Sequence, residues 1–129
     1  MNNRSQGQER REFQRLYINL GVYYKVLSPV PDSTESKVMS LDISPLGMSF
    51  VSNRNLPVFS ELELKFALSG TKQSAAPNLT LPIEVRAKVF SCILLNSNEF
   101  RVGVLFSSID SKTQERLIGY IRESSQRFP

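Results

Sequence analysis

Residues Leu79 to Phe106 read LTLPIEVRAKVFSCILLNSNEFRVGVLF. β-Branched and aromatic residues dominate this stretch, and Asn96-Ser97-Asn98 interrupts it with residue types that favour turns. We interpret Leu79–Leu95 as one long, bent strand and Phe100–Phe106 as its antiparallel partner in a hairpin. This hairpin indicates a mainly β protein.

Further strands are expected ahead of the hairpin. Leu62–Leu68 alternates apolar and polar residues and is the clearest of them. Three more strands are expected, over Leu16–Leu27, Lys37–Leu41 and Met48–Ser52, and Gly21 is a candidate bulge in the first of them. Loops are expected at Ser28–Ser36 and Ser69–Asn78, and a turn at Asp42–Gly47.

The apolar period changes near the end of the chain. Ser111 and Gln114 form a capping-box pattern, and Leu117 and Ile121 then fall on one helical face. This predicts a helix over residues 112–127. About six short antiparallel strands and one C-terminal helix make a small six-stranded antiparallel β-barrel the expected fold.

The chain has 129 residues, which fits one domain that buries roughly two thirds of its unfolded surface. Residues 1–9 are polar and aperiodic, so we expect a disordered tail, followed by a barrel domain over residues 10–129. The sequence contains no run with the length of a transmembrane helix and no signal-peptide pattern. We expect a soluble cytoplasmic protein without a membrane span.

Composition excludes several kinds of chemistry. The chain has no histidine and a single cysteine, Cys92, so a Ser-His-Asp triad, a histidine-ligated metal, a multi-cysteine zinc site and an internal disulfide are excluded. Cys92 lies in an apolar run, which predicts a buried, inert thiol. We expect no enzymatic activity and no cofactor. The net charge of +4 favours an anionic partner, but it is too small to predict DNA binding.

Two short motifs carry the binding chemistry. Residues 11–15 read REFQR, an RxxxR pattern, and residues 42–47 read DISPLG, a DxSxxG pattern. Guanidinium groups match a phosphate or the O6/N7 edge of guanine, and a carboxylate accepts hydrogen bonds from guanine's N–H groups. Alone, the first motif is typical of a solvated basic tail and the second of an ordinary turn.

Together, in this order and at this separation, the two motifs resemble the PilZ domain family. Residues 101–106, RVGVLF, are similar to that family's late GVxF strand, and the closing helix also fits. The resemblance implies a small β-barrel whose ligand is cyclic diguanylate. It also implies that an arginine at the position of Arg10 accompanies binding of two intercalated ligands, although Arg10 can equally be a solvated charge.

The resemblance suggests a role for each motif residue. Arg11 and Arg15 are assigned to guanine edges and phosphates, and Asp42 to the Watson–Crick edge of a guanine. Ser44 is assigned as a donor to a base or phosphate, and Gly47 as the residue that lets the turn approach the base. Ordering of the arginine loop on ligand binding would create a surface for a downstream partner in motility, polysaccharide synthesis or other surface behaviour.

Two alternatives remain open. A small basic barrel that binds single-stranded nucleic acid would need exposed aromatics beside basic residues, and Tyr17, Tyr23 and Tyr24 next to Lys25 are the only candidates. Strand alternation predicts that at least one of these tyrosines is buried. The other alternative is a PilZ-like interaction module that binds no nucleotide, but such modules usually lack the motifs that this chain keeps.

Overall fold

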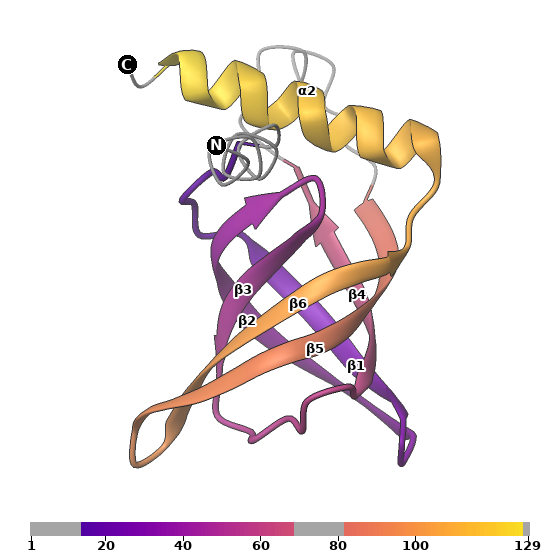
Figure 1. Cartoon of the computed structure of the whole chain (residues 1–129), viewed down its shortest axis with the longest axis vertical. Coiled ribbons are helices and arrows are strands. Elements are labelled where there is room, and N and C mark those ends of the chain that lie inside the picture. Colours follow the sequence, from indigo (N-terminus) through magenta and orange to yellow (C-terminus); the bar gives the residue numbers. More distant parts are fainter. Residues whose placement is uncertain (1–13, 69–81, 128–129) are drawn as a thin grey trace, which may run out of the picture.

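The computed structural model describes residues 14–68 and 82–127, and in it six antiparallel strands close into one barrel. The strands follow each other around the barrel in the order β1-β2-β3-β6-β5-β4 (Figure 1). The predicted fold, a six-stranded barrel with one C-terminal helix, is confirmed. The elements are β1 (Gly21–Ser28), β2 (Asp32–Ser44), β3 (Gly47–Ser52), β4 (Glu61–Ala67), β5 (Pro82–Asn96), β6 (Glu99–Ser108) and α2 (Ser111–Arg127).

Alternation along the strands fills the barrel interior with apolar side chains. In β4, Leu62, Leu64 and Phe66 are buried, and the residues between them are partly exposed. Tyr24 of β1 is fully buried, and its ring stacks on Phe50 with centroids 5.5 Å apart. The expectation that one tyrosine of the Tyr17–Tyr24 group packs in the core is therefore correct.

Other elements cover the two ends of the barrel. Helix α2 lies across one end and buries Leu117, Tyr120 and Ile121 (Figure 1). The connection between β3 and β4 runs under the opposite end and contributes the buried Leu56. Among the residues described, no helix has the length and apolar character needed to cross a membrane.

The first strand begins later than predicted. Strand β1 starts at Gly21, and of residues 16–20 only Leu16 makes a bridge, with Ile43. The cause is the buried hydroxyl of Ser40, which donates to the carbonyl of Ile18 and accepts from the N–H of Leu20. A side chain thus occupies backbone groups that a regular ladder would use. Gly21 is not a bulge, since it pairs regularly with Met39.

Two predicted irregular segments belong largely to strands. Strand β2 already begins at Asp32, inside the predicted Ser28–Ser36 loop, because pairing with β1 outweighs the weak strand propensity of its polar residues. At the predicted Asp42–Gly47 turn, only residues 45 and 46 form the turn, while the motif residues Asp42 and Ser44 lie in β2.

The helix cap and the cysteine also differ from expectation. Asp110 caps the helix in place of Ser111: its Oδ1 accepts from the N–H of Thr113 at 2.7 Å, and its carbonyl accepts from the N–H of Gln114 at 3.0 Å. Cys92 is half-buried, with its Sγ 3.4 Å from Oδ1 of Asn55. The barrel wall does not enclose Cys92 because it lies near the end of the barrel.

Gly47 begins β3 where that strand passes very close to β6. It pairs with Leu105, and a Cβ atom at this position would overlap the carbonyl oxygen of Val104. Glycine is therefore required here by the contact between two strands.

We expect Gly47→Ala to lower the free energy of unfolding of the ligand-free protein by about 1–3 kcal/mol, because backbone atoms must move to make room. Urea denaturation measures this change. Gly119→Ala is the matched control, since a Cβ at Gly119 on α2 meets nothing within 4 Å. In this control the free energy of unfolding should rise by up to about 1 kcal/mol. Equal stabilities of Gly47→Ala and the unmodified protein would contradict the strand contact.

The Asp110 cap makes helix stability depend on pH. The hydrogen bond from the backbone N–H of Thr113 holds the pKa of the Asp110 carboxyl below its usual value of 3.8. Because the folded-state pKa is lower, the stabilisation is present above the unfolded-state value and is lost as the pH falls through the folded-state value. Asp110→Ala should lower the melting temperature near neutral pH. Asp110→Asn keeps a capping oxygen without the charge. The difference in melting temperature between this variant and the unmodified protein should therefore shrink below about pH 4. Thermal unfolding followed by circular dichroism, at neutral pH and below about pH 4, tests this expectation. A difference in melting temperature between Asp110→Asn and the unmodified protein that does not change with pH would contradict it.

Candidate functional site

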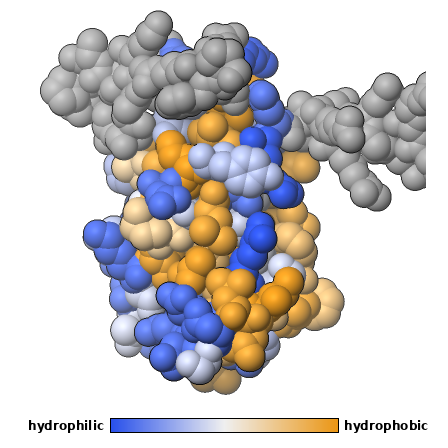
Figure 2. Space-filling model, turned by 90° about the vertical axis from the view of Figure 1, so that its left-hand side faces the viewer, coloured by the Kyte–Doolittle hydropathy of each residue, from blue (hydrophilic) through white to orange (hydrophobic). Residues whose placement is uncertain are grey.

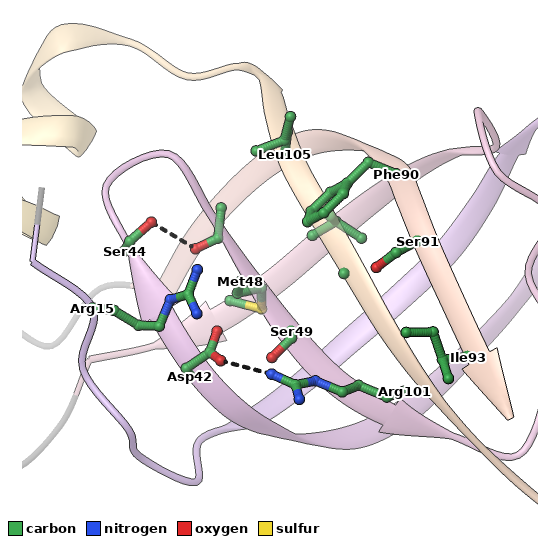
Figure 3. Close-up of a pocket in the computed structure, with 13 residues that line it drawn as sticks. Arg15, Asp42, Ser44, Met48, Ser49, Phe90, Ser91, Ile93, Arg101 and Leu105 are labelled. Atoms are coloured by element: carbon green, nitrogen blue, oxygen red, sulfur yellow. Dashed lines mark hydrogen bonds and ion pairs between the residues drawn. The ribbon is translucent and has the colours of Figure 1, made fainter. Parts of the chain in front are cut away.

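A pocket of about 280 Å³ lies on the outer face of the sheet formed by β2, β3, β6 and β5 (Figure 3). The segment before β1 supplies one side of it. The lining residues are Arg15, Asp42, Ser44, Gly47, Met48, Ser49, Phe90, Ser91, Ile93, Arg101, Gly103, Val104 and Leu105.

An extra residue in β2 determines which side chains face this pocket. Ser40 and Asp42 pair with adjacent residues of β3, so Leu41 is inserted between them. Such a bulge shifts the alternation of side chains by one position. Ser40 and Ile43 are therefore both fully buried on the core side, and Asp42 and Ser44 turn to the outer face.

The pocket floor is a row of small side chains that crosses four strands. Asp42 pairs with Ser49, Ser49 with Gly103, and Gly103 with Ser91. A Cβ on Gly103 would come within 2.7 Å of Ser91 Oγ and 2.9 Å of the Phe90 ring. The missing side chain at Gly103 thus keeps the floor low beside Phe90.

Arg15 is held at the rim of the pocket by the residue that follows it. The N–H and carbonyl of Leu16 form hydrogen bonds of 2.8 and 2.9 Å with the carbonyl and N–H of Ile43, the neighbour of Asp42. The hydroxyl of Ser40 fixes the same segment further along, at the carbonyl of Ile18 and the N–H of Leu20. These hydrogen bonds place the backbone of Arg15 against the barrel in the ligand-free structure.

Asp42 is the central charged group of the pocket. Its side chain is 7% exposed, and its Oδ2 lies 3.4 Å from Nη2 of Arg101. Figure 3 shows Arg15 and Arg101 reaching towards Asp42 from opposite sides. A buried carboxylate needs such donors, because its charge is poorly solvated. The 3.4 Å contact is long for a charge-assisted hydrogen bond, so Asp42 retains capacity to accept from another donor.

Ser49 adds an unpaired polar atom to the floor. Its side chain is buried, and its Oγ has no hydrogen-bond partner among the described residues. Ser60 Oγ, which lies outside the pocket, shares this property within the same ranges. An unpaired buried hydroxyl costs about 1–3 kcal/mol, a cost that a ligand group at the floor would remove.

The hydroxyl of Ser44, in contrast, contacts its own turn: it accepts from the N–H of Leu46 at 3.2 Å and lies 3.4 Å from the carbonyl of Gly47.

Apolar side chains complete the rim. Phe90, Ile93 and Leu105 all line the pocket and are about half exposed. The exposed phenyl ring of Phe90 provides a surface on which a planar base can stack. The pocket therefore combines positive charge, one buried carboxylate and an apolar wall.

The structure brings four of the six predicted residues together in this pocket: Arg15, Asp42, Ser44 and Gly47. Arg10 and Arg11 lie outside the described residues. Sequence reasoning missed Arg101, Ser49 and Phe90. Alternation along residues 101–105 places Arg101, Gly103 and Leu105 on one face, but which face is outward depends on strand register.

Known structures share this fold. The PilZ domain of YcgR from Escherichia coli with c-di-GMP matches at 12% identity and a TM-score of 0.59, covering 92% of this chain and 95% of that one. The motility inhibitor MotI/DgrA of Bacillus subtilis matches at 21% identity and a TM-score of 0.72. That match covers 92% of this chain and 52% of MotI/DgrA, so the chain spans about half the length of that protein.

The PilZ domain of CeSA from a cellulose-synthesizing bacterium matches at 10% identity and a TM-score of 0.58, covering 87% of this chain and 98% of that one. At these identities the matches show the fold alone. A search of functionally curated proteins finds no match. The family model for the PilZ domain matches residues 9–123, nearly the whole chain. The chain belongs to the PilZ domain family.

Proposed function

We propose that this domain is a receptor for cyclic diguanylate and that it binds the ligand in the pocket on the outer face of β2, β3, β6 and β5. The observation that carries the proposal is the meeting of Arg15 and Asp42, from two motifs far apart in sequence, at one pocket. The family membership and the c-di-GMP present with the similar YcgR domain support the choice of ligand.

Asp42 selects guanine in this proposal. The ring N–H and exocyclic amine of guanine are two donors that one carboxylate can accept together, and adenine presents a ring acceptor at the same edge. Arg101 releases Asp42 to the base and turns to the nearest phosphate. Its 3.4 Å contact with Asp42 and its 46% exposed side chain make that exchange inexpensive.

The arginines neutralise the phosphates. Arg15 lies at the rim beside Asp42, and Arg11 and Arg10 precede it by four and five residues. The ligand draws these two residues onto the barrel next to Arg15. A pocket of about 280 Å³ is at the small end for ligand sites, so it takes part of the dinucleotide, and the other base lies over the rim at Phe90.

Binding of this kind makes and breaks no covalent bond, so the output is a changed surface. The N-terminal arginine segment and the ligand together form a face that a downstream protein in motility, polysaccharide synthesis or surface behaviour recognises in the bacterial cytoplasm. The partner would thus bind the ligand-bound form of the domain in preference to the ligand-free form.

The proposal predicts selective binding. Calorimetric titration of the protein should show binding of cyclic diguanylate at micromolar or lower concentration, equivalent to about −8 kcal/mol or better. Cyclic diadenylate should bind roughly 5- to 150-fold more weakly, since one bidentate base contact is worth about 1–3 kcal/mol. GMP is the control for a single base.

Asp42→Asn tests the assignment of Asp42 to the guanine edge in the same titration. An amide offers a donor that suits adenine, so the ratio of the affinities for cyclic diguanylate and cyclic diadenylate should fall. Equal affinities for the two dinucleotides in the unmodified protein would show that Asp42 does not read the base, and no binding of either would overturn the proposed function. The same titration reports the stoichiometry, for which the Arg10 position leads us to propose two ligands per chain.

Arg15→Ala should weaken binding of cyclic diguanylate about tenfold to a hundredfold, because a hydrogen bond to a charged group contributes about 1.5–3 kcal/mol. The stability of the ligand-free protein should change by less than about 0.5 kcal/mol, since Arg15 is exposed at the edge of the described barrel. Arg11→Ala should behave in the same way.

The matched control is Arg86→Ala, which removes the same charge from an exposed position on β5 outside the pocket lining. Equal losses of affinity in Arg15→Ala and Arg86→Ala would mean that the arginine acts only through net charge. A large loss of stability in ligand-free Arg15→Ala would mean that it holds the fold.

A further inference from the structure

The hairpin of β5 and β6 carries an unusual concentration of exposed apolar side chains. Ile93, Leu94 and Leu95 are consecutive and between 50% and 60% exposed. Figure 1 shows this hairpin projecting beyond the end of the barrel, and Figure 2 shows apolar side chains gathered over the lower part of the face on that side. Exposed apolar patches of this kind mark interaction sites.

Along this stretch, strand β5 is paired on one side only among the described residues. Strand β4 pairs with β5 from Pro82 to Lys88, and the N–H of Phe59 and the carbonyl of Ser60 then bind Val89. Past that point, within residues 14–68 and 82–127, the only strand that pairs with residues 91–96 is β6. Every second residue there directs its N–H and C=O away from β6, which creates an open sheet edge in an otherwise closed barrel.

This edge lacks the features that normally prevent pairing. Between Lys88 and Glu99 there is no charged residue and no proline. Natural edge strands are commonly protected by lysine, proline or inward-pointing charges. We define residues 91–96 of β5 as the open edge.

A strained aromatic residue borders the open edge. Phe59 has a φ of 76° and is 78% exposed, in a turn closed by a hydrogen bond from the N–H of Ser60 to the carbonyl of Pro57. Such a turn favours glycine or asparagine at this position, and a bulky residue there is strained. A strained backbone that presents a phenyl ring to water, next to the strand end at Val89, indicates a side chain kept for a contact outside this chain.

We propose that the open edge pairs with the open edge of a second copy of this chain, as antiparallel strands about a two-fold axis. A strand can always pair with itself in this way, and the uncharged run places no like charges opposite each other. The pairing satisfies the free backbone groups and brings the side chains of Ile93, Leu94 and Leu95 into cross-strand contact with those of the other copy, with Phe59 at the margin. Because each copy uses its open edge once, the assembly closes as a dimer.

A second copy fits these features better than an acidic or basic partner, because the open edge offers no charge for recognition. The proposal concerns the ligand-free chain and does not depend on cyclic diguanylate. Phe90 and Ile93 also line the candidate pocket, so the two surfaces are neighbours on β5.

Sedimentation velocity of the full ligand-free chain over a concentration series tests the proposal. The unmodified protein should pass from monomer to dimer as concentration rises. Leu94→Lys should weaken this association by roughly tenfold or more, a cost of about 1.4 kcal/mol that two opposed charges easily supply. Val30→Lys is the matched control, since Val30 is 74% exposed on the connection between β1 and β2 and should leave the dimer unchanged. Circular dichroism shows that each variant is folded.

Cysteine cross-linking gives an independent readout. In a Cys92→Ser background, mild oxidation should link two copies most efficiently at the position on the two-fold axis and less efficiently at its neighbours. The variants to compare are Ser91→Cys, Ile93→Cys, Leu94→Cys and Leu95→Cys. A protein that stays monomeric at every concentration, or a dimer equally sensitive to Leu94→Lys and Val30→Lys, would overturn the proposal. Cross-linking without a peak along residues 91–95 would overturn it too.

Discussion

The single inserted residue at Leu41 is the constraint on which the rest of the pocket depends. Without it, regular alternation after Ser40 would turn Asp42 into the barrel interior and Ile43 out to solvent. A carboxylate would then enter a core built from apolar side chains, and the bridge that fixes Leu16 to Ile43 would be lost with it. The barrel therefore tolerates a carboxylate at position 42 only because the bulge places that residue on the outer face.

The same geometry explains how the Asp42 carboxylate can be buried with its nearest charged partner among the described residues 3.4 Å away. Asp42 lies between two arginines that approach it from opposite sides of the pocket, one on the segment before β1 and one on β6. Each arginine keeps much of its hydration, so the ion pair is weak and can be exchanged for another donor. The hydroxyl of Ser49 beside it has no partner among the described residues, so the pocket is less stable than a fully satisfied surface. In the proposed function, the ligand would supply the missing partner.

Much of the barrel could be predicted from local sequence, because its strands alternate clearly and the hairpin turn at residues 97–98 carries suitable residues. The motif residues could be named as candidates because the RxxxR and DxSxxG patterns are each visible within a few consecutive residues. Sequence alone could not place Arg101, whose direction depends on the register between β3 and β6, nor the late start of β1, which depends on one buried hydroxyl on another strand. The polar beginning of β2 also escaped prediction, since long-range pairing there outweighs propensity. These failures share a cause: each feature is determined by a residue distant in sequence.

The connectivity of the barrel also has a consequence for its synthesis. Arg15 and Asp42 lie in the first 44 residues, whereas Phe90, Arg101 and Gly103, which complete the pocket, come from the last two strands. The contact between β3 and β6 joins these two halves. A nascent chain on the ribosome therefore has both motifs long before it has a pocket, and the pocket is complete only after β6 has emerged and closed the barrel. Occupancy of the pocket would report that the whole domain has finished folding.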